Sequence, residues 1–131
     1  MTANSIIQVN DLASYDGYEA MKKLLKKPEH PSAIISGSHD LSKGILRAIQ
    51  EAGLSIPEDI SIISYDNIPA TENLEVPLST VGVPLSAITE KLSEVLIALI
   101  NEEAVEQRIY LEPELNITQS CQTLNGGNIN E

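Results

Sequence analysis

The stretch from Ala33 to Asn67, AIISGSHDLSKGILRAIQEAGLSIPEDISIISYDN, places a segment of helical spacing between two short apolar runs. The runs cover residues 33–35 and 60–63, and each turns polar soon after, as buried strands do. Between them, apolar side chains recur at steps of three and four, at Leu41, Ile45, Leu46 and Ile49. Gly53 stands where the C-terminal cap of a helix is expected. The stretch therefore predicts a strand, a helix and a second strand.

The sequence before this stretch has the same order of elements. Residues 6–9 form an apolar run that ends in the polar Asn10 and Asp11, and helical spacing follows from Asp16 until Pro28. The first half of the chain thus alternates strand and helix. Short apolar strands joined by helices pair in parallel, and right-handed crossovers place the helices over the sheet. We predict an α/β fold, in which a parallel sheet has helices on both faces.

The second half of the chain begins with a loop-like stretch, residues 68–80, which has no periodicity. Pro84 then opens the longest helical pattern, since proline is well tolerated at the first helical position. Its apolar stripe is expected to pack against the rest of the fold, and consists of Leu85, Ile88, Leu92, Leu96 and Leu99. Residues 108–111 and 115–120 are predicted to form two short strands. Residues 124–131 are expected to be a disordered tail.

Size and charge exclude several classes of protein. The 131 residues suffice for about one domain, since domains run on the order of 100 to 200 residues. Hydrophobic residues make up 42% and charged residues 21%, the composition of an ordinary globular domain. Lys and Arg number 8 against 19 Asp and Glu, giving a formal net charge of −11. Because this charge repels a phosphate backbone, the chain alone is not expected to bind DNA.

The compartment is predicted from the cysteine count and the N-terminus. The single Cys121 cannot form an internal disulfide, which excludes a disulfide-stapled secreted scaffold. The N-terminus lacks the basic start and apolar stretch of a secretion signal, and no apolar run approaches the ~20 residues that cross a membrane. We therefore expect a cytoplasmic protein without a membrane partner.

Short polar side chains cluster where three predicted strands end. The clusters are Asn10 with Asp11, the turn of residues 36–40, and Asp66 with Asn67. Ligands of open parallel sheets bind outside the carboxyl ends of the strands, where helix N-termini also present free N–H groups. Such side chains suit a hydroxylated ligand such as a sugar. The alternative is that they only cap helices and turns.

Catalytic and metal sites find no support in the sequence. Ser38, His39 and Asp40 are consecutive, whereas a catalytic triad needs side chains that converge from separate parts of a chain. His30, His39 and Cys121 lack the spacing of metal ligands. Gly126 and Gly127 are not followed by a helix, so no phosphate-binding loop is predicted. We expect no enzyme activity, no metal and no cofactor.

Several strings together resemble the lactose/galactose repressor family of bacterial transcription regulators. The most specific are IPEDISIISYDN at 56–67 and PLSTV at 77–81. Further matches are GYEAM at 17–21, PSAII at 31–35 and GILRAIQEAG at 44–53. The resemblance implies a sugar- or nucleoside-sensing core of two α/β subdomains, similar to type I periplasmic binding proteins. In that family an N-terminal helix-turn-helix binds operator DNA.

The resemblance also implies how the chain divides. Residues 1–80 correspond to part of the C-terminal effector-binding subdomain, and residues 81–107 to a crossover and a helix of the N-terminal subdomain. Residues 108–123 correspond to the returning strands. The helix-turn-helix is expected to be missing from this chain, so operator DNA is a partner only through that absent domain.

Site residues carry over from the family by position. Asp66 matches a carboxylate that accepts hydrogen bonds from effector hydroxyls, and Ser38 matches a small polar effector contact. Leu12 stands where the family often has an aromatic ring against the effector, and His39 replaces an aspartate that begins the next helix. The segment with Lys43 and Arg47, and the loop with Leu74, match surfaces that pair two subunits, which implies a homodimer.

The leading hypothesis is therefore the effector-binding, dimerising part of a sugar-operon repressor, with a sugar or nucleoside as its small-molecule partner. A sugar-binding component of a transporter has the same architecture but would require export. A small flavodoxin-like enzyme or a receiver domain is a third hypothesis. A receiver would need paired acidic residues after the first strand and a Lys after the last, whereas Asp11 stands alone and no Lys follows Asp66 nearby.

Overall fold

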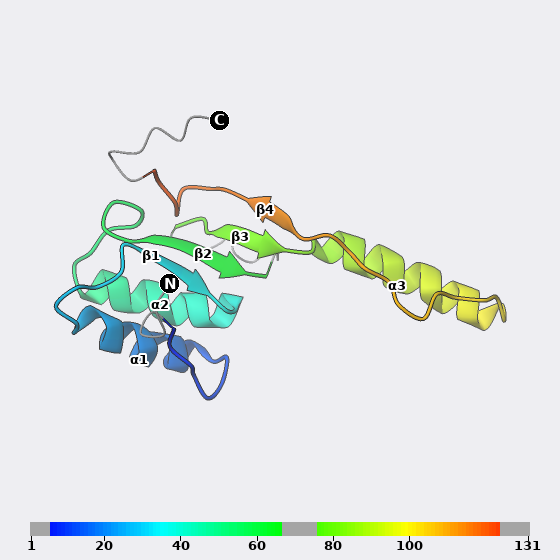
Figure 1. The fold of residues 1–131 in the computed structure, drawn as a ribbon, viewed down its shortest axis with the longest axis horizontal. Helices are drawn as coiled ribbons and strands as arrows, with labels where there is room; N and C mark the ends of the chain where they lie inside the picture. Colours follow the sequence, from blue (N-terminus) through cyan, green and yellow to red (C-terminus); the bar gives the residue numbers. More distant parts are fainter. Residues whose placement is uncertain (1–5, 67–75, 124–131) are drawn as a thin grey trace.

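A computed structural model describes residues 6–66 and 76–123 of the chain (Figure 1). Three helices and four strands follow one another within these residues. Their order is α1 (Ser14–Leu25), β1 (Ala33–Ser36), α2 (His39–Glu51), β2 (Ser61–Tyr65), β3 (Ser79–Gly82), α3 (Leu85–Ile100) and β4 (Glu114–Asn116). The predicted strands at 33–35 and 60–63 and the helix between them are confirmed within one or two residues.

The four strands form one sheet in the order β1-β2-β3-β4. β1 and β2 pair in parallel, with Ile34 opposite Ile62, and β2 and β3 continue the parallel pairing. β4 is the last strand of the sheet and pairs with β3 in the antiparallel direction, with Leu115 opposite Val81. The α/β class is therefore confirmed, and the sheet is mixed because the chain returns beside β3 after α3.

The core lies between α2, α1 and the sheet. Its side chains are almost fully buried, and the largest are Met21, Ile49, Ile60, Ile62 and Leu78. Burying each such side chain stabilises the fold by roughly 1.5–3 kcal/mol. α2 packs against β1 and β2, and α1 packs against α2, so these two helices stack on one side of the sheet (Figure 1). On the strands, Ile35 is 70% exposed and Tyr65 is 56% exposed. The described helices thus cover one face of the sheet, whereas the sequence pattern predicts helices on both faces.

Two glycines allow α1 and α2 to cross at close range. A Cβ atom on Gly44 would lie 1.8 Å from the Ser14 carbonyl oxygen, and one on Gly17 would lie 2.2 Å from the Leu41 carbonyl oxygen. Both distances are far below van der Waals contact. The helix backbones therefore touch directly, which fixes the position of α2 relative to α1.

Three predicted elements differ in the structure. Residues 6–9 form no strand, and Ile6, Ile7 and Val9 line a hollow of about 710 Å³ together with residues of α1 and β1. Residues 108–111 form no strand either, and the strand predicted at 115–120 is shorter in the structure and begins one residue earlier, at Glu114–Asn116. β3 begins inside the stretch predicted to be loop. An isolated apolar run becomes a strand only where a neighbouring backbone satisfies its hydrogen bonds.

α3 does not pack as the stripe predicts. None of its residues is buried, and the helix extends away from the sheet (Figure 1). Leu92, for example, remains 63% exposed. Periodicity identifies an apolar face but does not say what covers it, and four of the five stripe residues are exposed in the structure, namely Leu85, Leu92, Leu96 and Leu99.

Some expectations concern residues that lie outside the described ones. They are Asn67, Leu74 and the tail 124–131. No helix within 6–66 and 76–123 is long and apolar enough to cross a membrane.

The glycine contact between α1 and α2 can be tested by substitution. We expect Gly44→Ala to lower the free energy of unfolding by roughly 1–3 kcal/mol, the range for overpacking, although alanine favours helices. Urea denaturation measures this difference. Gly37→Ala is the matched control, because its added Cβ would meet only the Leu41 Cδ1 atom at an ordinary 3.8 Å. Equal stability of the Gly44 variant and the wild type would contradict the close crossing.

Candidate functional site

The end of β2 meets the start of α2. The backbone N–H of His39, the first residue of α2, donates to Asp66 Oδ2 at 3.4 Å. Asp66 follows β2 directly, and its own N–H donates to the Val81 carbonyl at 3.1 Å. Two of the three predicted clusters are therefore adjacent in space.

Asp66 has an uncommon backbone conformation. Its backbone φ is 111°, in a region that residues other than glycine rarely adopt. Strained residues of this kind gather at functional sites, where the surrounding structure holds them. Asp66 is also only half-buried, so its carboxylate remains within reach of a small molecule.

Ser38 caps α2. Its hydroxyl accepts a hydrogen bond from the Leu41 N–H at 3.2 Å, the usual geometry of a serine N-cap. The capping interpretation is thus confirmed for this residue, and the hydroxyl proton stays available as a donor. Asp40 does not share this role. It pairs with Lys43 at 2.9 Å, and that hydrogen bond lowers the pKa of the Asp40 carboxyl.

His39 lies beneath the surface at the same place. Its side chain is 8% exposed, and its Nδ1 atom is buried without a hydrogen-bond partner in the described part of the chain. A buried polar atom without a partner is uncommon in folded proteins. Ser38, His39 and Asp40 do not interact as a triad, because the serine hydroxyl caps the helix and Asp40 faces Lys43.

Buried serines connect this site to the core, and sequence reasoning missed them. Ser42 Oγ lies 2.9 Å from Ser64 Oγ and 2.8 Å from the Ser38 carbonyl oxygen. All three serines are buried. Ser42 lies four residues after Ser38 and three before Ile45, on the inward side of α2, and this spacing was the signal that could have identified it.

The first predicted cluster stands apart from the other two. Asn10, Asp11 and Leu12 lie in the loop before α1 and are exposed, with Leu12 at 56%. The Leu12 N–H donates to the Asp11 carboxylate at 2.7 Å. Within residues 6–66 and 76–123, no hydrogen bond joins this loop to Asp66 or to the start of α2. The expectation of three strand ends on one rim is therefore wrong for the first of them, because residues 6–9 form no strand.

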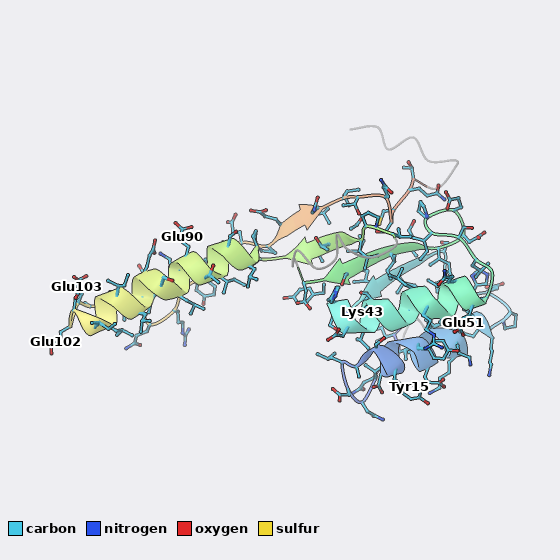
Figure 2. The ribbon with its side chains drawn as sticks, turned by 180° about the vertical axis from the view of Figure 1, so that it is seen from behind. Tyr15, Lys43, Glu51, Glu90, Glu102 and Glu103 are labelled. Carbon is cyan, nitrogen blue, oxygen red and sulfur yellow. The ribbon has the colours of Figure 1, made fainter. Side chains whose placement is uncertain are left out.

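Two residues expected at a subunit interface, Lys43 and Arg47, lie on the exposed side of α2. Figure 2 shows Lys43 and Glu51 toward opposite ends of this helix. Arg47 pairs with Glu51 at 2.9 Å, and its guanidinium lies 5.0 Å from the centre of the Tyr18 ring. Hydrogen bonds from the Tyr18 hydroxyl and then from Arg47 lower the pKa of Glu51. Lys43, Arg47 and Gln50 also border a hollow of about 310 Å³ whose other lining residues are apolar, namely Leu46, Ile49, Leu54, Ile56 and Val76.

The chemistry available at the α2 start is hydrogen bonding. A carboxylate, a serine hydroxyl and helix N–H groups can bind hydroxyl groups of a neutral ligand. No group of three or more His, Cys, Asp or Glu side chains in the described residues could hold a metal ion.

Comparison with known proteins identifies close relatives. The model of the periplasmic binding protein-like domain matches residues 2–121. A lactose operon repressor of Rhizobium radiobacter is 36% identical over 99 residues, which cover 76% of this chain and 88% of that relative. The HTH-type transcriptional repressor PurR of Pasteurella multocida is 38% identical over 109 residues, covering 82% of this chain and 33% of the relative. The chain thus spans about one third of the length of PurR.

Solved structures agree with these sequence relatives. A LacI family transcriptional regulator from Enterococcus faecium, with bound ribose, superposes with a TM-score of 0.76 at 28% identity. The match covers 86% of this chain and 41% of that one. The lac repressor dimer bound to operator has the same fold, with a TM-score of 0.74 at 23% identity, covering 86% of this chain and 40% of that one. The chain belongs to the periplasmic binding protein-like domain family, among the LacI-type transcription regulators.

Proposed function

We propose that this chain is the effector-binding part of a sugar-operon repressor. The observation that carries the proposal is the contact between the Asp66 carboxylate and the first residue of α2. It joins a half-buried acceptor to a helix N-terminus at the carboxyl end of parallel strands, where ligands of open α/β sheets bind.

The effector is a small hydroxyl-rich molecule. One hydroxyl of a sugar or nucleoside donates to Asp66, and a second exchanges hydrogen bonds with the Ser38 hydroxyl. The ribose bound to the Enterococcus faecium regulator and the ribose operon repressor of Escherichia coli, 34% identical over 100 residues, support this class of ligand. Leu12 is not assigned a contact, since it lies in the separate loop before α1.

The effector acts by shifting an equilibrium between subdomain arrangements. A ligand that contacts both subdomains favours the closed arrangement, and this bias changes the affinity of a linked DNA-binding domain. Operator DNA is bound by a part of the protein outside this chain, in line with the net charge of −11.

Residues 1–80 form part of the C-terminal subdomain. Residues 81–107 contribute a crossover and a helix to the N-terminal subdomain. Residues 108–123 are the segment that returns from it. The projection of α3 away from the sheet supports this division.

No catalytic role is assigned. The Ser38 hydroxyl caps a helix and Asp40 pairs with Lys43, so no nucleophile is activated by a neighbouring base here. The relatives named above are repressors, which supports a binding function rather than an enzyme activity.

The repressor is a homodimer that pairs through α2. Lys43 and Arg47 form a cationic border beside the hollow that Leu46 and Ile49 line. An apolar base with a polar border is typical of subunit interfaces. The lac repressor with the same fold is itself a dimer.

The role of Asp66 can be tested by titrating this chain with D-ribose, a hexose and a purine nucleoside. For a ligand that binds, Asp66→Ala is expected to weaken affinity by more than about 1.5 kcal/mol, the scale of a hydrogen bond to a charged group. NMR titration measures millimolar affinities in a chain of 14.2 kDa.

Asp59→Asn is the matched control, because this exposed carboxylate only accepts the Ser55 N–H before β2. Unchanged affinity in the Asp66 variant would remove that residue from the site. If none of the three compounds perturbs the wild type, the proposed ligand class is wrong.

Dimerisation through α2 predicts a change of mass on substitution. Wild type should sediment at twice the 14.2 kDa chain mass, and Leu46→Glu should sediment as a monomer because it places a charge in the apolar contact. Analytical ultracentrifugation separates the two states. Gln107→Glu adds the same charge at an exposed position and should remain dimeric. A monomeric wild type, or a dimeric Leu46 variant, contradicts this interface.

A further inference from the structure

Three buried serines form a continuous hydrogen-bonded chain between β2 and the start of α2. Ser64 lies on β2 and Ser42 in the first turns of α2, and neither side chain is exposed at all. Their hydroxyl oxygens are 2.9 Å apart, and Ser42 Oγ lies 2.8 Å from the Ser38 carbonyl. We call Ser64, Ser42 and Ser38 the hydroxyl chain.

The direction of the protons in the hydroxyl chain follows from its chemistry. A carbonyl can only accept, so Ser42 donates its single hydroxyl proton to Ser38. Ser64 then donates to Ser42 at 2.9 Å, a shorter contact than the 3.4 Å to its own neighbour, the Tyr65 carbonyl. Hydrogen bonds in series strengthen one another in a dry interior.

The Ser38 carbonyl is the point where these bonds converge. It accepts from the Ser42 hydroxyl at 2.8 Å, from the Ser42 N–H at 3.1 Å and from the Ser36 hydroxyl at 3.0 Å. The N-cap residue of α2, Ser38, is therefore held by hydrogen bonds from both β1 and α2. The next residue, His39, donates its N–H to Asp66.

We propose that Ser42 and Ser64 are positioning residues of the effector site. The hydroxyl chain ties α2 to β2 two residues before Asp66, and so sets the separation between the Asp66 carboxylate and the helix N-terminus. The affinity of a ligand that contacts both groups depends on this separation. The inference rests on the proposed function, because it assigns a role at the same site.

A second pair of buried serines provides the control for stability alone. The Ser79 N–H donates to Ser120 Oγ at 2.7 Å, and Ser120 Oγ donates to the Ile62 carbonyl at 2.6 Å. Ser120 is as deeply buried as Ser42, but within residues 6–66 and 76–123 no hydrogen bond joins its hydroxyl to the hydroxyl chain or to Asp66. Ser120→Ala should therefore weaken the fold without moving the site.

The first measurement needs no ligand. In NMR spectra of the 131-residue chain, Ser42→Ala and Ser64→Ala should shift the His39 amide proton and reduce its protection from solvent exchange. Ser120→Ala should leave both quantities unchanged. If the His39 amide responds equally to all three substitutions, or to none of them, the positioning role is overturned. Should Ser42→Ala fail to fold, Ser64→Ala carries the same test, since it leaves Ser42 bound to Ser38.

The second measurement uses D-ribose as the probe. Ser42→Ala and Ser64→Ala should each weaken binding roughly threefold to tenfold, the scale of one neutral hydrogen bond. The double variant should lose little more than either single one, because both remove the same link. Wild-type binding that both variants and Ser120→Ala retain in full would overturn the inference and leave the proposed function intact. Absence of wild-type binding would instead count against ribose as the ligand, while the His39 amide still decides the positioning role.

Discussion

The parallel pairing of β1 with β2, which α2 connects, is the constraint on which the rest of the structure depends. In parallel strands both carboxyl ends lie on one edge, so Ser36 and Asp66 are brought to the same edge although they are far apart in sequence. α2 must start at that edge to cross back over the sheet. The meeting of His39 with Asp66 therefore follows from topology, and side-chain chemistry only refines it.

The close crossing of the helices adds a second constraint. Gly17 and Gly44 let α1 press α2 against the strands, and Met21 and Ile49 fill the space beneath. A deeply buried core then coexists with a site whose own residues are small and polar. Serines rather than large apolar side chains occupy the interior near Asp66, since hydroxyls can satisfy one another at short range.

The sequence predicts the central unit well because its signals are local. Apolar runs at 33–35 and 60–63 flank a clear helical stripe, and the polar residues after each run mark the site edge. Failures occur where a second partner decides the outcome. Residues 6–9 have strand character but no paired neighbour, and the apolar stripe of α3 remains mostly exposed in the described chain. The burial of Ser42 and Ser64 was not predicted, because burial of a serine depends on a partner distant in sequence.

Under the proposed function, the backbone conformation of Asp66 places ligand recognition and stability in competition at one position. A φ of 111° suits glycine, which would relieve the strain, but glycine has no carboxylate. Asparagine tolerates such angles as well as aspartate does, yet it gives up the negative charge. Selection for stability and selection for ligand binding would therefore favour different amino acids at this position. This chain carries the aspartate carboxylate and not the glycine that would relieve the backbone strain.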